Sequence, residues 1–323
     1  MKSTFWHKLK KPFFVLAPMA DVTDGAFRRI IAKYGKPDVL WTEFVSADGL
    51  ASKGRENLLV DLSFTPKEKP IVAQIFSSNP DAIRKTAALV KKLKFDGLDI
   101  NMGCPDRKVE KSGAGAALIK DFKKAKEIIQ AAKEGAGPNL PVSVKTRIGY
   151  KEDVLDEWLV NLLEEEPAAV TIHGRTRKEM SLVPARWDAI ARAVEIRDGF
   201  FGKKKIRTLI IGNGDVKNLK EAGERAKESG VDGVMIGRGI FGNPWLFNKR
   251  RKIEPSREEK LKVMLEHTLL FDKLFRGKKS FDVMKKHFKA YVNGFDGARE
   301  LRNELYKTKT ASEVKAILSP LIK

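Results

Sequence analysis

The segment FDGLDINMGCPDRKVEKSGAG, residues 95–115, joins a short strand-like run to a charged loop. Residues 97–100 are suited to a buried strand, and Pro105 ends this strand. The residues that follow make segment 105–112 too polar to bury, so Cys104 is expected at a rim. A lone cysteine is often only a small core residue. However, the carboxyl ends of parallel strands carry the catalytic groups of α/β enzymes, which favours a chemical role for Cys104.

The chain is strongly basic. Its 323 residues include 63 lysine and arginine residues against 42 aspartate and glutamate residues, a formal net charge of +21. An excess of this size produces a field that attracts polyanions. Composition does not distinguish RNA, DNA and an anionic membrane surface as the partner. A lysine-rich solvated surface without any such partner is the simpler alternative.

Cysteine and histidine usage limits the possible chemistry. One cysteine allows no internal disulfide, and four histidines show no metal-ligand spacing, so we expect no metal site and a reducing, cytoplasmic location. The N-terminus superficially resembles a signal peptide, but Pro18 interrupts its short apolar run. No stretch approaches the roughly 20 apolar residues of a membrane helix, so we expect no membrane association. We also expect a monomer.

Strand-like and helical patterns alternate through residues 1–250. Strands are expected at residues 13–16, 39–45, 71–76, 97–100, 142–148, 169–173, 208–211 and 231–236. Helices are expected up to residue 34 with Asp21 or Thr23 as the N-cap, from Asn79 onward, and over residues 116–133 and 154–165. This alternation predicts an α/β fold, a (β/α)8 TIM barrel, with a doubly wound sheet as the alternative.

Residues 251–323 contain no further strand candidate and are expected to form a small all-helical domain. Ser256 with Glu259 and Thr310 with Glu313 have the spacing of a capping box. One helical face carries an apolar stripe that we interpret as core: Phe281, Met284, Phe288 and Tyr291. The opposite face carries Lys285, Lys286 and Lys289. With 18 basic and 10 acidic residues, this region is predicted to bind something anionic.

In a barrel, the residues at the carboxyl ends of the strands line the active site. These are Pro18, Met19, Ala20, Gln74, Asn101, Cys104, Lys145, Arg147, His173, Arg175, the turn 212–215 and the turn 237–239. The two glycine-rich turns follow the seventh and eighth strands, where barrels commonly bind a phosphate, so a phosphate-bearing ligand is predicted. Lys145 needs an anionic or electron-rich partner unless it reaches the rim. His173 is equally consistent with a hydrogen-bonded core histidine.

Taken together, these segments resemble the tRNA-dihydrouridine synthase family of flavoenzymes. The match runs in order through APMADVTDGAFR, VAQIF, GLDINMGCP, VSVKTRIGY, TIHGRTR, IGNGDV and VMIGRGIFGNPWLF. It continues into the helical region with KKHFKAYVNG and ARELRNEL. VKTR or GNGD alone is a weak signal, but NMGCP, TIHGR and GNGD together are highly specific.

The resemblance implies an FMN-binding barrel over residues 1–250 and a tRNA-binding helical domain over residues 251–323. It implies that NADPH or NADH reduces FMN, and that flavin N5 passes hydride to C6 of a specific tRNA uridine. Cys104 is implied as the catalytic acid that protonates C5, giving dihydrouridine. The implied cofactor-binding residues are Pro18, Met19, Ala20, Gln74, Lys145, His173, Asn213, Gly214, Asp215, Gly237 and Arg238. The implied substrate-binding residues are Asn101, Arg175, Lys285, Lys286 and Lys289.

The loop after Arg175 departs from the family pattern. Ser181, Leu182 and Val183 stand where an aromatic residue and a glycine are usual, and Arg186 precedes Trp187 where an uncharged or acidic residue is expected. These changes are expected to alter substrate contacts, and they leave the implied flavin residues intact. Two other functions stay open: a flavin oxidoreductase acting on a free small molecule, and a non-catalytic RNA-binding protein with a decayed barrel.

Overall fold

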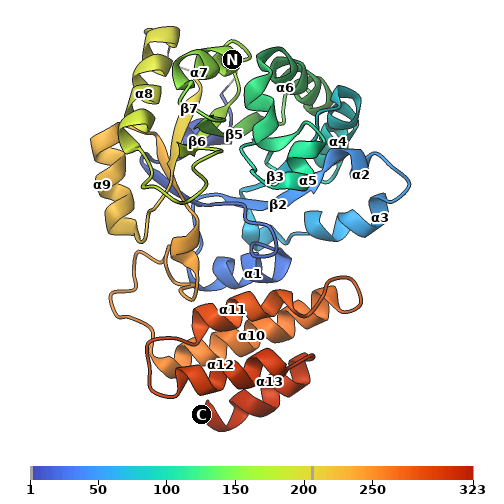
Figure 1. Ribbon diagram of the computed structural model, residues 1–323, viewed down its shortest axis with the longest axis vertical. Helices are drawn as coiled ribbons and strands as arrows, with labels where there is room; N and C mark the ends of the chain where they lie inside the picture. The colour runs from blue at the N-terminus through green and yellow to red at the C-terminus, as the bar shows by residue number, and fades with distance from the viewer. Residues whose placement is uncertain (1–2, 205–206, 323) are drawn as a thin grey trace.

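The computed structural model describes residues 3–204 and 207–322 (Figure 1). The predicted domain ends at residues 1 and 323 lie outside the described residues. Eight strands form one parallel sheet in the order β1-β8-β7-β6-β5-β4-β3-β2. The strands are β1 (Phe13–Leu16), β2 (Leu40–Ser46), β3 (Ile71–Phe76), β4 (Gly97–Met102), β5 (Val142–Gly149), β6 (Ala169–Thr176), β7 (Leu209–Asn213) and β8 (Gly233–Ile236). A parallel bridge between Val15 and Val39 closes the ring beside β2. The predicted barrel is confirmed.

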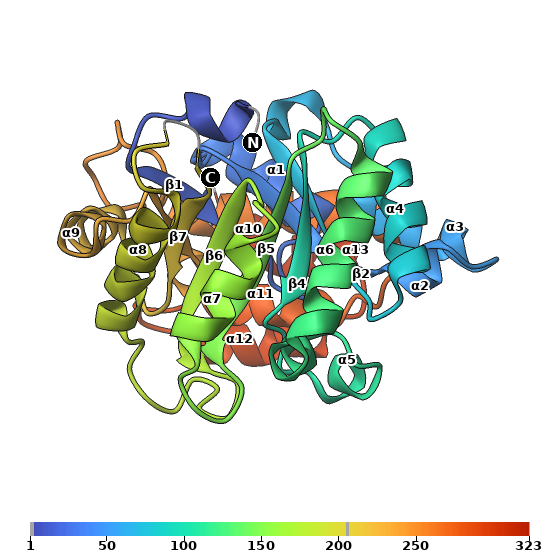
Figure 2. The ribbon, with the colours of Figure 1, turned by 90° about the horizontal axis from the view of Figure 1, so that it is seen from above.

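Helices surround the strands on the outside (Figure 2). They are α1 (Gly25–Tyr34), α4 (Pro80–Lys92), α6 (Phe122–Ala136), α7 (Leu155–Leu163), α8 (Trp187–Phe201) and α9 (Leu219–Ser229), with the short α2 (Ala47–Leu50), α3 (Arg55–Leu58) and α5 (Arg107–Lys111) in connecting segments. The barrel interior is filled by side chains that include Phe13, Trp41 and Met235. Trp6, from the 3₁₀ helix η1 (Phe5–Lys8), packs against Trp41 with ring centroids 5.5 Å apart.

Two sequence-based predictions about helix starts are wrong. The N-cap of α1 is Asp24, whose carboxylate accepts hydrogen bonds from the backbone N–H groups of Ala26 and Phe27 at 2.8 and 2.9 Å. Thr23 cannot serve because its hydroxyl accepts from the Met19 N–H, at 2.9 Å, and Asp21 lies in a left-handed turn with φ 53°.

The second wrong prediction concerns the helix expected over residues 116–133, which is divided into a 3₁₀ helix and an α-helix. The apolar segment η4 (Gly115–Lys120) is a buried 3₁₀ turn against β4, because the Ala116 N–H donates to the Cys104 carbonyl. Asp121 then caps α6 by accepting from the Lys124 N–H at 2.9 Å. By contrast, the predicted cap at Asn79 is confirmed.

The C-terminal region consists of α10 (Arg257–Phe275), α11 (Val283–Tyr291), α12 (Ala298–Lys307) and α13 (Ala311–Leu318), below the barrel in Figure 1. The capping box of Ser256 and Glu259 is present. Thr310 caps α13, but the Glu313 carboxylate accepts from the Lys309 N–H. The predicted stripe is core: Met284, Phe288 and Tyr291 are buried, and Phe281 packs beside them.

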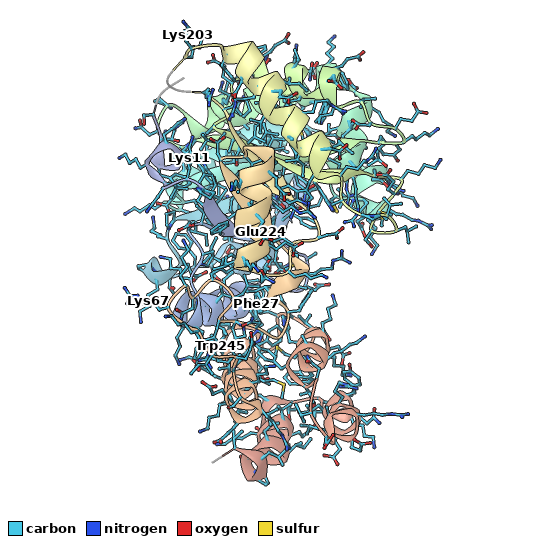
Figure 3. All side chains as sticks on the ribbon, turned by 90° about the vertical axis from the view of Figure 1, so that its left-hand side faces the viewer. Lys11, Phe27, Lys67, Lys203, Glu224 and Trp245 are labelled. Atoms are coloured by element: carbon cyan, nitrogen blue, oxygen red, sulfur yellow. The ribbon has the colours of Figure 1, made fainter. Side chains whose placement is uncertain are left out.

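Buried contacts join these helices to the barrel, with Phe27 and Trp245 at the boundary (Figure 3). Phe27 lies 5.6 Å from the ring of His267 and 5.1 Å from that of His287, between centroids. Lys279 adds ion pairs of 2.7 Å to Glu43 and to Asp61. A division into domains at residue 250 stays a prediction. Among the described residues, no helix combines the length and apolar character needed to cross a membrane.

Candidate active site

A cavity of about 290 Å³ opens at the carboxyl ends of the strands. Its lining includes ten of the predicted site residues: Pro18, Met19, Lys145, His173, Arg175, Asn213, Gly214, Asp215, Gly237 and Arg238. Ala17, Arg147, Met180, Ser181 and Val216 complete it. Most of the residues predicted at the carboxyl ends of the strands therefore lie together in this cavity. Ala20, Gln74, Asn101 and Cys104 are outside this lining, as are the three lysines of α11.

One corner of the cavity is suited to an anion. At Gly237 an added Cβ would make ordinary van der Waals contacts, 3.7 Å from Ala17 and 3.8 Å from Met19. Gly214, at φ 135°, must be a glycine, because a Cβ there would come within 2.5 Å of the Ala185 methyl group. Arg238 is largely exposed beside these turns. Backbone and guanidinium groups can therefore approach phosphate oxygens here.

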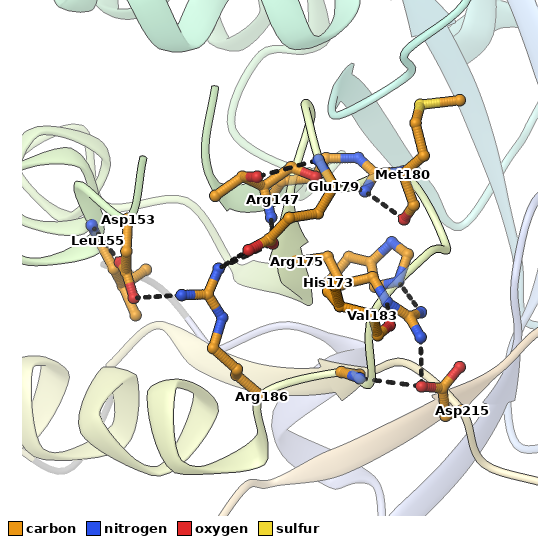
Figure 4. Close-up of polar contacts among 12 residues, drawn as sticks. Arg147, Asp153, Leu155, His173, Arg175, Glu179, Met180, Val183, Arg186 and Asp215 are labelled. Atoms are coloured by element: carbon orange, nitrogen blue, oxygen red, sulfur yellow. Dashed lines mark hydrogen bonds and ion pairs between the residues drawn. The ribbon is translucent and has the colours of Figure 1, made fainter. Parts of the chain in front are cut away.

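Asp215 holds two arginines at this corner. Its carboxylate pairs with Arg175 and accepts from the Ala185 N–H at 2.9 Å (Figure 4). It also pairs with Arg238 at 3.0 Å. Burial opposes ionisation, but these hydrogen bonds and charges hold the pKa of Asp215 below its usual value. The ionised carboxylate thus holds both guanidinium groups in place. Its single negative charge balances only one of their two positive charges, so this corner of the cavity keeps a net positive charge.

His173 sits beside these arginines and is neutral. Burial, together with the charges of Lys145 and Arg147, lowers the pKa of His173 well below its usual value. Arg175 lies 3.2 Å from His173 Nε2 and can only donate, so Nε2 accepts and the ring proton is on Nδ1. The ring's Nδ1–H is therefore a donor for a ligand carbonyl or ring nitrogen.

Lys145 is the unpaired cation of the site. It lines the cavity from β5, and no hydrogen bond or ion pair of its ammonium group is found among the described residues. Burial, with the nearby charge of Arg147, lowers the pKa of Lys145 to about 8. A partly buried ammonium without a partner is costly, so the cavity fits a ligand that brings negative charge or electron-rich atoms to this position.

A buried polar chain runs from β5 to Cys104. Ser143 donates to Asp99 at 2.5 Å, and Gln74 donates to the other oxygen of Asp99 at 2.6 Å. The Asn101 amide donates to Gln74 at 3.0 Å. The side-chain oxygen Oδ1 of Asn101 accepts a hydrogen bond from the backbone N–H of Cys104 at 2.8 Å. The side chains of Gln74 and Asn101 therefore help to position the loop that carries the Cys104 thiol.

Cys104 is half-buried at the rim, as its charged neighbours predict. Burial raises the pKa of the Cys104 thiol, with the charge of Asp106 acting in the same direction. The thiol is therefore protonated at neutral pH and can act as an acid. The loop that carries Cys104 is joined to the loop after β6 by an ion pair. Arg177, directly after β6, donates to Glu110 of α5, with Nε–O distances of 2.8 and 2.9 Å.

The structure explains the unusual charge of Arg186. Its guanidinium donates to both oxygens of Glu179 at 2.8 Å and lies 3.9 Å from Asp153 in the loop after β5 (Figure 4). Glu179 also accepts from the Thr176 N–H at 2.7 Å. Arg186 therefore connects the loop after β6 to the loop after β5.

The three predicted lysines lie on α11, beside the mouth. Lys286 is 3.3 Å from Asp21, in the turn that follows β1. Lys285 pairs with Asp282 at 2.6 Å, and Lys289 is exposed. The basic face of α11 is therefore continuous with the open end of the barrel.

Sequence reasoning missed several contributors, including Ala17 and Val216 of the cavity lining. Asp99 lies within the strand that leads to Cys104, and its charge in a buried run was a readable signal. Met180 lines the cavity from an irregular loop, for which the sequence offered no signal. No cluster of three potential metal-ligating side chains is found within residues 3–204 and 207–322.

Lys145 gives a pH dependence that can be measured on cofactor-free protein. Its folded-state pKa of about 8 lies below the value of roughly 10.4 for a lysine in an unfolded chain. Between these values the unfolded state binds more protons, so the free energy of unfolding is expected to rise with pH. Denaturant titrations should show this rise in wild type and in the exposed-site control Lys91→Met, but not in Lys145→Met. Equal slopes in all three proteins would contradict the burial of Lys145.

Comparisons with known proteins agree with this geometry. A family model described as dihydrouridine synthase (Dus) matches residues 15–323. The chain is 42% identical over 321 residues to a probable tRNA-dihydrouridine synthase of Staphylococcus aureus (strain COL), covering 98% of this chain and 95% of that protein. It is 43% identical over 321 residues to a probable tRNA-dihydrouridine synthase 2 of Bacillus subtilis (strain 168), covering 98% and 96%.

Solved structures show the same fold at low identity. A 2-naphthoyl-CoA reductase complex superposes with a TM-score of 0.54 at 11% identity, over 73% of this chain and 49% of that one. A histamine dehydrogenase from Rhizobium sp. 4-9 gives 0.51 at 12% identity, over 80% and 48%. The chain spans about half the length of these proteins, and at this identity the likeness shows the fold alone.

Proposed function

This chain belongs to the dihydrouridine synthase family, and we propose that it reduces the C5–C6 double bond of a specific uridine in tRNA, with FMN as cofactor and NADPH or NADH as reductant. The feature that carries the proposal is the unpaired Lys145 in a cavity with a phosphate-suited corner. Cys104 follows β4, the strand that pairs with β5 and aligns Asn101 with Lys145. That combination matches a ligand with an anionic tail and an electron-rich ring system. FMN has both.

The residues of the cavity have distinct roles toward FMN. Gly214, Gly237 and Arg238 would hold the phosphate. Pro18 and Met19, which line the cavity, would pack against a flat ring, with the neighbouring Ala20 outside the lining. Lys145 and the Nδ1–H of His173 would face polar atoms of the ring. The chemistry that FMN supplies when bound is hydride delivery to C6 of the uracil. The protein's own part is orientation, exclusion of water and proton supply.

Cys104 would supply the proton. Reduction at C6 leaves negative charge on the uracil, and a protonated thiol placed near C5 completes the reaction. Asn101 fixes the backbone of Cys104, and Lys145 would stabilise the developing charge. The target base is out of reach inside folded RNA, so it must be flipped into the barrel mouth.

The first test pairs a visible spectrum with dihydrouridine formation in unmodified tRNA and NADPH. A yellow protein that modifies tRNA supports the proposal. A yellow protein that leaves tRNA untouched but reduces a free pyrimidine or enone would favour a small-molecule flavin oxidoreductase. A colourless protein that binds tRNA would favour a non-catalytic RNA-binding role.

Arg238 provides a test of the phosphate corner. Replacing it with alanine is expected to weaken FMN binding by about 10- to 100-fold, the usual value of a charge-assisted hydrogen bond to phosphate. Riboflavin, which lacks the phosphate, should bind wild type and variant alike. Fluorescence titrations with both flavins measure this, with Arg107→Ala in α5 as a matched arginine control. An equal loss for FMN and riboflavin would place Arg238 elsewhere on the ligand.

A further inference from the structure

The loop after β6 exposes apolar side chains at the edge of the cavity. Met180, Leu182 and Val183, here called the rim cluster, account for three of the eight large hydrophobic residues found exposed in the described chain. Leu182 is 84% exposed. Met180 lines the cavity itself, together with its neighbour Ser181. Single exposed apolar residues need no explanation, but a cluster beside a ligand site indicates a contact surface.

The backbone beneath the rim cluster is fixed. Arg147 donates to the Met180 carbonyl at 3.4 Å, and Arg175 Nε donates to the Val183 carbonyl at 2.6 Å (Figure 4). The Leu182 N–H donates to the Glu179 carbonyl at 2.9 Å. Glu179 is in turn held by Arg186. Several hydrogen bonds from arginines thus hold a short loop whose apolar side chains contact solvent, so the exposure of Leu182 is built into the fold.

The surroundings identify the chemistry of the partner. Lys178 is exposed beside the rim cluster, and the chain as a whole has a net charge of +21, so this apolar surface lies on a strongly basic protein. The nearby guanidinium groups of Arg177 and Arg186 are paired with Glu110 and Glu179. A nucleic acid offers the complementary combination, because its bases have flat apolar faces and its backbone is anionic. Three side chains are also too small a surface for a stable protein interface.

We propose that Leu182, supported by Met180 and Val183, packs against the nucleobase next to the target uridine and takes the place of the stacking contact that this base loses. This inference rests on the proposed function, since it concerns the same substrate and the same cavity. Extruding a base costs its stacking, and an apolar side chain at the vacated position offsets part of that cost. The rigid backbone described above would present the side chain without a further ordering cost.

The test compares wild type with Leu182→Ala and with Ile253→Ala. Ile253 is a matched control because it is also aliphatic and 79% exposed, in the segment that leads to α10. After the modified uridine has been mapped, a tRNA with 2-aminopurine beside it reports unstacking by fluorescence. We expect Leu182→Ala to lower kcat/KM for tRNA by about tenfold, as burial of one leucine side chain implies, and to reduce the fluorescence rise. Ile253→Ala should match wild type.

The remaining outcomes separate this inference from the proposed function. Flavin content and NADPH-driven flavin reduction should be unchanged in Leu182→Ala, because Leu182 is outside the cavity lining. If wild type forms no dihydrouridine, the proposed function fails. If wild type is active and Leu182→Ala equals it in rate and fluorescence, the rim contact fails alone. Two other results for Leu182→Ala would also overturn the inference, provided that tRNA modification is unaffected. One is loss of self-association in sedimentation, and the other is loss of binding to phosphatidylserine vesicles.

Discussion

Cys104→Ala is expected to lower the rate of dihydrouridine formation by about 10²- to 10⁴-fold, the usual contribution of a general acid. The thiol is the acid proposed for C5, and burial raises its pKa so that the proton is present at neutral pH. The loss should fall on the chemical step and not on tRNA binding, because the thiol is a small part of the surface. Single-turnover assays with saturating enzyme and pre-reduced flavin measure this step directly.

Two further variants make the result specific. Cys104→Ser keeps the size of the side chain but offers a hydroxyl, a far weaker acid, so it should remain strongly impaired. Ser112→Ala, an exposed change in the same loop, should be near wild type. Flavin reduction by NADPH should be equal in all of them. Near-normal turnover in Cys104→Ala would remove the thiol from the reaction and leave the proton to water or to another group.

The barrel and the composition of its mouth could be predicted because both depend on local patterns. Buried parallel strands are short apolar runs, and their carboxyl ends share one face. Lys145 and His173 lie in β5 and β6, and Asp215 follows β7, so their meeting in one cavity required only strand order. The choice of Asp24 over Thr23 as the cap of α1 did not follow, because it depends on the bond between the Thr23 hydroxyl and Met19.

Long-range polar contacts were beyond sequence reasoning. The chain from Asp99 through Gln74 to Asn101 depends on the register of β3 against β4, which pairs Gln74 with Asp99. Arg186 was an anomaly in the sequence and is explained only by Glu179 and Asp153, which come from two loops. The roles of these residues toward FMN and tRNA stay predictions, because they concern ligands that the fold implies but does not itself contain.

Charge reversal on α11 is the second change with a large expected effect. Replacing Lys285, Lys286 and Lys289 together with glutamate should weaken tRNA binding by at least about 100-fold near physiological salt, because each lysine that neutralises a phosphate also releases counterions. The face of α11 that carries these residues lies beside the barrel mouth, as the contact of Lys286 with Asp21 shows. The reversal leaves the buried stripe of α11 unchanged, so the helix should still fold.

The matched control reverses Lys91, Lys92 and Lys227, which are exposed in the last turns of α4 and α9. These turns lie at the opposite end of the barrel, because the helices run antiparallel to the strands. Both variants change the net charge equally, so a loss restricted to the α11 variant indicates position and not total charge. Binding measured over a range of salt should give a shallower slope for the α11 variant only. Similar losses in both would mean that tRNA senses the overall field, and the helical region would lose its predicted role in docking.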